Sequence, residues 1–427
     1  MITVEPPVER ALLVAAPRKG SADAKKIGEH LEELARLVDT AGAQVVGEVS
    51  QQVDKPNPAT LIGEGKVEEL RQRVVDDGVT LVIFDEELSP VQGANLEREL
   101  KVRVMDRAEV ILDIFATRAR SHEARLQVEL AQMEYLLPRL TRMWTHLSRI
   151  RGGIGLRGPG ETQLETDRRM IRRKIQSLRE KLTGVEHHRE RIRAGRSPML
   201  SVALVGYTNA GKSSILRALS GVHEIFVEDR LFATLDTLTR EVDLGEGLRA
   251  RVTDTVGFIR KLPHHLVASF RATLEEARGA DVLLHVVDAS HPEWEDQMRV
   301  VEQVLAELDL TDRPVLPVFN KMDAVEDPVA LTARVKELLP EAVFATTMRT
   351  DGVEPLKARL RALARARKPV VTVHVPLADG ARLAELYREG EVISREQVNG
   401  RYEVAVRLEG WKVDRLKAEG VEVRAGA

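Results

Sequence analysis

The stretch that decides the fold runs from residue 199 to residue 219 and reads MLSVALVGYTNAGKSSILRAL. An apolar run, predicted to be a buried strand, leads into Gly206-Tyr-Thr-Asn-Ala-Gly-Lys-Ser213, and helix-forming residues follow. This order of strand, loop and helix separates a phosphate-binding loop from an ordinary glycine turn. Because the backbone amides of such a loop surround phosphate groups, we expect Lys212 to reach the β- and γ-phosphates and Ser213 to bind Mg²⁺.

Two motifs further along the chain fit the same nucleotide. Asp254-Thr-Val-Gly257 ends a predicted strand that begins near Arg249, and there the carboxylate suits indirect contact with Mg²⁺ and the glycine amide can sense the γ-phosphate. Asn320-Lys-Met-Asp323 ends another predicted strand. Its carboxylate can accept hydrogen bonds from guanine N1 and the exocyclic amine, while Lys321 can pack over the base. Adenine lacks these donors, so the tetrad favours GTP.

The segment between the first two motifs, Leu231 to Thr239, supplies hydroxyl groups for the nucleotide's metal ion. It reads LFATLDTLT and offers Thr234, Thr237 and Thr239. A switch threonine completes the coordination of Mg²⁺ in GTP-binding proteins. The spacing alone does not choose among the three.

Composition and periodicity divide the 427 residues into four predicted domains. Residues 1–116 alternate strand-like and helical patterns, which predicts a small α/β domain with a parallel sheet. Residues 117–196 predict an antiparallel helical hairpin whose first helix is interrupted at Pro138. Residues 197–367 predict a doubly wound P-loop GTPase domain. Residues 368–427 predict a small α+β domain with a hairpin turn at Asn399-Gly400. The fold class is therefore multidomain α/β.

The environment predicted for the chain is the cytoplasm. The sequence has no cysteine, and its first residues lack the pattern of a signal peptide. No apolar run reaches the roughly 18 residues that span a bilayer. The histidine pairs His187-His188 and His264-His265 have no metal-site spacing, so packing or surface roles are expected for them.

A basic, glycine-rich segment lies between the two helical patterns of the hairpin. It runs from Arg151 to Arg169 and reads RGGIGLRGPGETQLETDRR. From Arg139 to Arg196 there are 16 Lys and Arg against 6 Asp and Glu, a net charge of +10 on a chain whose overall charge is −3. A solvated helical surface could carry this charge, but it does not explain the glycines. Glycines permit close approach to crowded RNA, and Arg151 and Arg157 can pair with phosphates or stack on bases, although charge alone does not exclude DNA.

These blocks, in this order, resemble the HflX family of translation-associated GTPases. The resemblance rests on QVELAQMEYLLPRL, GGIGLRGPGETQLETDRR, GYTNAGKS, LFATLDTLTR, DTVGFIRKLP and NKMD, and it covers nearly the whole chain. It implies that Thr234 is the Mg²⁺-binding threonine. It also implies binding to the large ribosomal subunit, at ribosomal RNA near the peptidyl transferase centre, stimulation of the GTPase by ribosomes and, in some members, splitting of stalled or stressed ribosomes.

The motifs and the resemblance together predict the site residues. The catalytic set is Lys212, Thr234 and Gly257, and the metal ligands are Ser213 and Thr234. Contacts with GTP or GDP are expected from Gly206, Tyr207, Thr208, Asn209, Ala210, Gly211, Lys212, Ser213, Phe232, Ala233, Thr234, Leu235, Asp236, Asp254, Thr255, Val256, Gly257, Asn320, Lys321, Asp323, Thr346, Thr347 and Met348. Contacts with RNA are expected from Arg151, Gly152, Gly153, Arg157, Gly158, Gly160, Arg168 and Arg169. We expect a monomer.

Three positions bear on the mechanism. Thr346-Thr-Met348 stands where the family usually has Ser-Ala-Lys, so only the backbone amide is expected to reach the guanine oxygen. Phe258 follows DTVG, where many GTPases have a glutamine that orients water, so hydrolysis should be slow without a partner. Asn209 either helps to hold K⁺ near the phosphates or only stabilises the loop.

Two functions of different class fit these features. The protein is either an enzyme whose GTP cycle drives a mechanical event on ribosomes, or an RNA- or subunit-binding factor whose affinity GTP sets. A GTPase for tRNA modification is a more remote alternative.

Overall fold

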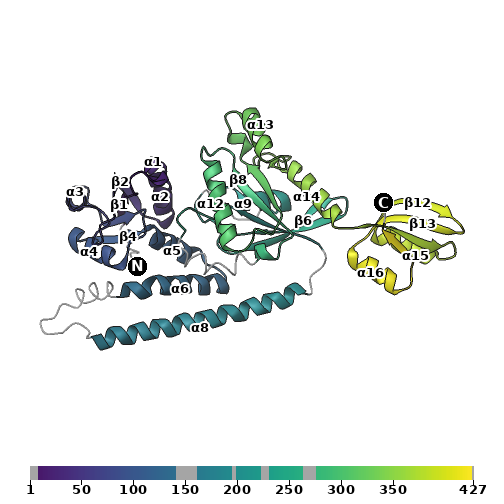
Figure 1. The fold of residues 1–427 in the computed structure, drawn as a ribbon, viewed down its shortest axis with the longest axis horizontal. Helices are drawn as coiled ribbons and strands as arrows, with labels where there is room; N and C mark the ends of the chain where they lie inside the picture. Colours follow the sequence, from purple (N-terminus) through teal and green to yellow (C-terminus); the bar gives the residue numbers. More distant parts are fainter. Residues whose placement is uncertain (1–7, 141–160, 195–198, 223–229, 263–275, 426–427) are drawn as a thin grey trace, which may run out of the picture.

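The computed structural model describes residues 8–140, 161–194, 199–222, 230–262 and 276–425. Within them, three separate β-sheets follow one another along the chain, and two long helices lie below the first two sheets (Figure 1). The predicted multidomain α/β fold class is confirmed.

The first sheet belongs to the N-terminal α/β domain. Its four parallel strands have the order β2-β1-β3-β4. They are β1 (Arg10–Ala15), β2 (Gln44–Ser50), β3 (Leu81–Phe84) and β4 (Arg103–Asp106). The helices are α1 (Ala22–Lys25), α2 (Ile27–Ala41), α3 (Glu64–Asp76), α4 (Pro90–Leu100) and α5 (Arg107–Arg118). The predicted parallel sheet is present, because apolar strands here alternate with helices that cover both faces.

The helical hairpin consists of α6 (His122–Leu136), the short 3-10 helix η1 (Leu137–Arg139) and α8 (Glu161–Ala194). Ser121 caps α6 by accepting a hydrogen bond from the Ala124 amide. The regular helix ends just before Pro138, as predicted. α6 and α8 pack through an apolar seam, formed by Leu126, Leu130, Ile175, Leu178 and Leu182.

The second sheet has six strands in the order β10-β9-β8-β5-β7-β6, with β6 antiparallel to β7. The strands are β5 (Leu200–Gly206), β6 (Leu238–Gly245), β7 (Leu248–Asp254), β8 (Val282–Asp288), β9 (Val315–Asn320) and β10 (Val343–Phe344). The described helices are α9 (Lys212–Ser220), α12 (Trp294–Glu307), η2 (Met322–Ala324), α13 (Pro328–Leu338) and α14 (Glu354–Ala366). Ligands of such doubly wound sheets bind at the carboxyl ends of the parallel strands. The predicted nucleotide motifs follow β5, β7 and β9.

The C-terminal unit is a four-stranded antiparallel sheet with two helices, in the order β12-β13-β11-β14. Its elements are β11 (Val370–Pro376), α15 (Gly380–Glu389), β12 (Glu391–Val398), β13 (Arg401–Arg407), α16 (Gly410–Ala418) and β14 (Val423–Ala425). Asn399 and Gly400 have φ of 48° and 75°. This left-handed conformation forms the predicted hairpin turn between β12 and β13.

The N-terminal domain and the P-loop domain share one continuous hydrophobic core. The ring of Phe115 on α5 meets the ring of Phe232 edge to face, with centroids 4.7 Å apart. Phe232 lies in the predicted switch segment, so the N-terminal domain packs directly against that segment. Among the described helices, none is both long and apolar enough to cross a membrane.

Candidate nucleotide-binding site

The phosphate loop connects β5 to α9 and depends on two glycines. Gly206 has φ of 153°, and a Cβ there would lie 2.3 Å from the Val286 carbonyl oxygen. Gly211 has φ of 92°, and its Cβ would lie 2.2 Å from Nδ2 of Asn320. Only glycine meets both requirements. Nδ2 of Asn320 donates to the Ala210 carbonyl, at 3.0 Å, and so joins the guanine motif to the loop.

Lys212 is held inside the loop. Its Nζ donates to the carbonyl oxygens of Gly206 and Tyr207, at 3.2 and 2.9 Å. Burial lowers the pKa of this ammonium to about 8, although the charge of Asp254 opposes the shift. A negatively charged phosphate would favour the protonated form. Lys212 is therefore placed to exchange two neutral partners for the phosphates of a nucleotide.

Three oxygen-bearing side chains converge where the metal ion is expected. Oγ of Ser213 lies 2.7 Å from Oγ1 of Thr234 and 2.5 Å from Oδ2 of Asp254. Burial raises the pKa of Asp254, and its Oδ1 is buried without a hydrogen-bond partner among the described residues. Hard oxygen ligands of this kind suit Mg²⁺, so the residues fit the ion. Bound there, Mg²⁺ would neutralise charge on the β- and γ-phosphates.

The structure also distinguishes between the candidate switch threonines. Thr234 lies beside Ser213, whereas Oγ1 of Thr239 pairs with Oγ1 of Thr253, at 2.9 Å, between β6 and β7. Thr234 is thus the threonine that the fold brings to the predicted metal site, as the family resemblance implied.

The segment that follows β7 is tied to the phosphate loop through its backbone. The Phe258 amide donates to the Gly206 carbonyl at 3.0 Å, and its carbonyl accepts from the Thr208 amide at 2.6 Å. The Phe258 ring is buried in the core. A Cβ on Gly257 would lie 2.7 Å from Cα of Thr208 and 2.9 Å from Nζ of Lys212. Gly257 can therefore approach the γ-phosphate position only without a side chain.

A cavity of about 50 Å³ lies beside the phosphate loop, where the phosphates are expected. It is lined by Thr208, Asn209, Gly211, Lys212, Ser213, Ser214, Arg230, Phe232, Ala233, Thr234, Thr255 and Gly257. Most of the residues predicted for the phosphate end are thus brought together. Arg230 and Ser214 were not among the predicted residues.

The guanine end lies at the carboxyl ends of β8 and β9. Nζ of Lys321 forms an ion pair with Oδ2 of Asp288, at 2.7 Å. Asp323 accepts a hydrogen bond from Thr346, whose Oγ1 also accepts from the Met348 amide at 3.2 Å. The Met348 side chain is 78% exposed. The Thr-Thr-Met loop therefore positions, through Thr346, the carboxylate that is predicted to bind guanine.

Leu235 and Asp236 of the predicted nucleotide set are among those that do not line the phosphate cavity. Leu235 is buried in the shared core. The carboxylate of Asp236 accepts hydrogen bonds from the amides of Arg120 and Ser121, at 2.9 and 3.2 Å, and from the Ser121 hydroxyl. Asp236 thus joins the switch segment to the start of α6 instead of lining the phosphate cavity.

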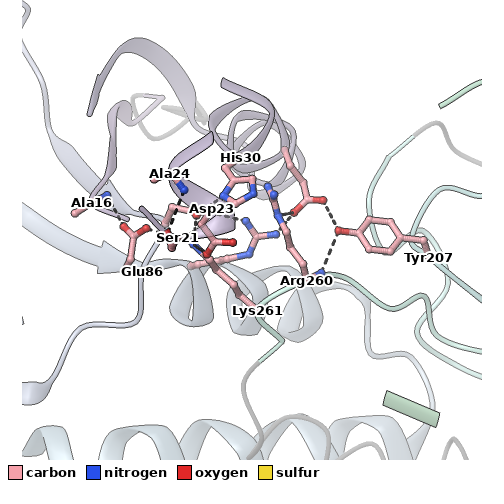
Figure 2. A network of polar contacts seen from close by, with 12 residues as sticks. Ala16, Ser21, Asp23, Ala24, His30, Glu86, Tyr207, Arg260 and Lys261 are labelled. Carbon is pink, nitrogen blue, oxygen red and sulfur yellow. Dashed lines mark hydrogen bonds and ion pairs between the residues drawn. The ribbon is translucent and has the colours of Figure 1, made fainter. Parts of the chain in front are cut away.

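A charge network links the phosphate loop to the N-terminal domain, and sequence reasoning missed it. Oη of Tyr207 accepts a hydrogen bond from the Arg260 amide at 3.0 Å (Figure 2). The same phenol donates to Glu33 of α2 at 2.5 Å. Nε of Arg260 also reaches Glu33, at 3.1 Å. Burial and the charge of Glu33 raise the pKa of Tyr207 well above its usual range. The phenol is therefore a hydrogen-bond donor at every ordinary pH.

The second half of this network lies at the carboxyl edge of the N-terminal sheet. Nζ of Lys261 reaches Asp85 at 2.6 Å and Glu86 at 3.3 Å. Asp85 also pairs with the buried guanidinium of Arg107, at 2.7 Å, and Arg107 pairs with Glu33. Burial would lower the pKa of Arg107, but the charges of Glu33 and Asp85 outweigh it and raise that pKa. Asp85 directly follows β3, so an acidic residue at a strand end was the available sequence signal.

The predicted RNA contacts lie largely outside the described residues, because Arg151 to Gly160 fall in the segment 141–160. Arg168 is half-buried and Arg169 is exposed on α8. The described residues contain no group of three or more acidic or histidine side chains that could hold a metal ion. His264 and His265 lie outside the described part of the chain.

The doubly wound sheet, the phosphate loop and the guanine motif define a P-loop GTPase. Family models match three consecutive parts of the chain: "GTP-binding GTPase N-terminal" over residues 28–116, "GTP-binding GTPase Middle Region" over 118–196 and "50S ribosome-binding GTPase" over 201–321. The GTPase HflX of Magnetococcus marinus is 43% identical over 99% of this chain and 98% of its own. The GTPase HflX of Escherichia coli K12 is 42% identical over 89% of this chain and 90% of its own. The chain belongs to the HflX family of GTPases.

Among solved structures, the crystal structure of the SsGBP and GDP complex resembles the chain. It is 24% identical, has a TM-score of 0.48 and covers 84% of this chain and 98% of that one.

Proposed function

We propose that the protein is a GTP-hydrolysing translation factor that binds the large ribosomal subunit through its basic helical arm and splits or rescues stalled ribosomes under stress. The observation that carries this proposal is the contact between Asp236 and the start of α6. Thr234 lies at the predicted metal site, and Asp236 follows two residues later in the same switch segment. A change of nucleotide that displaces Thr234 would therefore also displace Asp236, which contacts the start of the arm.

The N-terminal packing supports the same coupling. Phe232 contacts Phe115 of α5, and α5 leads within a few residues to Ser121 at the start of α6. A displacement of the switch segment would disturb an aromatic contact and a helix cap together. Packed cores have discrete arrangements, so such a displacement would be passed on as a shift of the arm.

The arm's chemistry favours ribosomal RNA as the partner. α8 carries a run of basic residues that includes Arg168 and Arg169, and the glycine-rich segment precedes it in sequence. Basic residues beside glycines can approach crowded RNA, and the family resemblance directs the tip to the peptidyl transferase centre. We place the protein in the cytoplasm as a monomer, where its GTPase works with Mg²⁺.

Hydrolysis is expected to be slow for the protein alone and to be stimulated by ribosomes. The Phe258 ring is buried, and a phenyl group cannot orient an attacking water by a hydrogen bond. A group supplied by the ribosome would complete the site. Potassium held near Asn209 is a second candidate activator, and hydrolysis rates measured in K⁺ and in Na⁺ at equal ionic strength decide whether it acts.

A GTP-regulated RNA- or subunit-binding factor without splitting activity is the alternative. Sedimentation of purified ribosomes through sucrose gradients, with protein and GTP, a non-hydrolysable analogue or GDP, separates the two functions. Release of free subunits in the GTP-bound state supports the proposal. Nucleotide-dependent binding to intact ribosomes, with no free subunits in any nucleotide state, supports the alternative.

A further inference from the structure

Arg230 is a positively charged residue at the phosphate cavity that the motifs do not account for. Of the residues that line this cavity, only Lys212 and Arg230 carry a positive charge. Lys212 is buried within the loop, whereas Arg230 is exposed at the cavity's edge. Within the described part of the chain, no hydrogen bond or ion pair holds the Arg230 side chain. Arg230 therefore places a second cationic side chain at the phosphate cavity.

Its position in the chain links Arg230 to the metal site. It precedes Leu231-Phe232-Ala233-Thr234, so the arginine and the metal-binding threonine belong to one short segment. The Phe232 amide donates to Oγ1 of Thr208 at 2.9 Å, which holds this segment against the phosphate loop. Arg230 therefore belongs to a segment that is held beside the phosphate loop.

Arg230 also lines a wider cleft between the N-terminal domain and the P-loop domain. This cleft has a volume of about 950 Å³; residues between Val8 and Val45 line one side, and the P-loop domain contributes Asn209, Leu231, Asp288 and Lys321 besides Arg230. Asn209 and Arg230 line both spaces. Arg230 therefore lies where the phosphate cavity meets this cleft, on the side of the cleft that also carries Lys321.

We propose that Arg230 is a catalytic residue of the GTPase, whose guanidinium contacts the phosphates beside Asn209 and stabilises the charge that develops during hydrolysis. The proposal rests on the GTPase activity proposed above. In the reaction, a water oxygen forms a bond to the γ-phosphorus, and the bond from that phosphorus to the β–γ bridging oxygen breaks. The bridging electron pair stays on GDP, and the proton of the water leaves with the phosphate released.

A cation at that position would stabilise the transition state of this step. Charge accumulates on the bridging oxygen and the transferred group, and arginine presents planar, paired donors that match phosphate oxygens. The Phe258 side chain supplies neither charge nor a hydrogen-bond donor. A guanidinium beside Asn209 would supply the charge that potassium would otherwise bring, so hydrolysis by the unaltered protein should proceed equally fast in K⁺ and Na⁺.

The test compares the single-turnover hydrolysis rate and the GDP affinity of the intact protein with those of R230A, R230K and R249A. Arg249 is an exposed arginine on β7 that pairs with Glu241 and serves as the matched control. We expect R230A to lose about tenfold to a thousandfold in rate, R230K to lose less, and R249A to match the unaltered protein, since supplied arginines contribute factors of this size or larger elsewhere. GDP affinity should stay within about threefold in all of them.

A second measurement separates catalysis from binding. GDP with aluminium fluoride mimics the transferring phosphate, so R230A should bind this combination far more weakly than the unaltered protein while it binds GDP alone normally. An unchanged rate in R230A, or a loss of GDP affinity as large as the loss of rate, would overturn the proposal. Absence of GTP hydrolysis by the unaltered protein, alone and with ribosomes, would instead refute the proposed function.

Discussion

The phenol of Tyr207 in the phosphate loop donates a hydrogen bond of 2.5 Å to Glu33 of the N-terminal domain. Arg260, which follows the DTVG motif, reaches the same carboxylate and gives its amide to the same phenol. Glu33 therefore joins the phosphate loop and the segment after DTVG to one helix, α2. We interpret this contact as the place where the first domain is held to the nucleotide site.

A double-mutant cycle measures the strength of this contact. Y207F removes one donor to a charged acceptor, which costs about 1.5–3 kcal/mol in the free energy of unfolding. In the double variant Y207F/E33Q, the loss of unfolding free energy should be smaller than the sum of the two single losses. The difference, the coupling energy, should be about 1–2 kcal/mol in urea unfolding. Y387F, at an exposed tyrosine of the C-terminal unit, should change stability by less than about 0.5 kcal/mol. Additive losses would show that the two residues do not interact in solution.

The affinity for GDP should fall as the pH rises above about 8, where the buried Lys212 ammonium loses its proton in the free protein. Phosphate raises the pKa of Lys212, so binding takes up a proton at higher pH. The dissociation constant should therefore increase by up to about tenfold per pH unit. K212R keeps its positive charge over this pH range and should lack the part of the slope that comes from Lys212. Ionisation of the guanine base affects both proteins equally, so the difference between their slopes reports on Lys212. Identical slopes in a titration with fluorescent GDP would contradict the assignment.

G257A should abolish most hydrolysis. The added Cβ would lie 2.7 Å from Cα of Thr208, so the segment must shift and carry its amide away from the γ-phosphate. Loss of one such donor costs about a hundredfold to a thousandfold in rate. G184A on α8 meets no atom within 4 Å and is the control. The measurement is the single-turnover hydrolysis rate of both variants. A G257A rate within threefold of the unaltered protein would show that the Gly257 amide does not contribute to hydrolysis.

D236A should uncouple the arm from the nucleotide. It removes the acceptor for the amides of Arg120 and Ser121 but leaves Thr234 and the phosphate loop in place. Intrinsic hydrolysis should stay within about threefold, while the ribosome-stimulated rate should fall about tenfold, a factor typical of coupling between sites. E241A, an exposed carboxylate on β6, is the matched control. An equal fall in both rates would mean that Asp236 serves the nucleotide site itself.

The sequence predicted those parts of the fold and site that depend on local pattern. Lys212, Ser213 and Asn320 follow apolar strands at fixed spacing, and the carboxyl ends of parallel strands meet at one edge of a sheet. The apolar residues of α6 and α8 recur at helical spacing, and they form the seam.

Contacts between distant segments could not be predicted in this way. Asp236 lies within a family block, yet its partners are amides 115 and 116 residues away. Glu33 is one acidic residue on an amphipathic helix, and nothing in the neighbouring sequence distinguishes it from the exposed acidic residues of that helix. Its partners, Tyr207 and Arg260, become visible only once the two domains are packed together.

The most direct test of the account is the rate of GTP hydrolysis, with and without purified large ribosomal subunits, by the intact protein and by a variant lacking Gly152 to Gly160. We predict that the deletion leaves GDP affinity and intrinsic hydrolysis unchanged and abolishes the stimulation by subunits, because the proposed function assigns the basic glycine-rich segment to RNA and not to the nucleotide. Full stimulation of the deletion variant, or loss of its nucleotide binding, would contradict this division between the arm and the GTPase site.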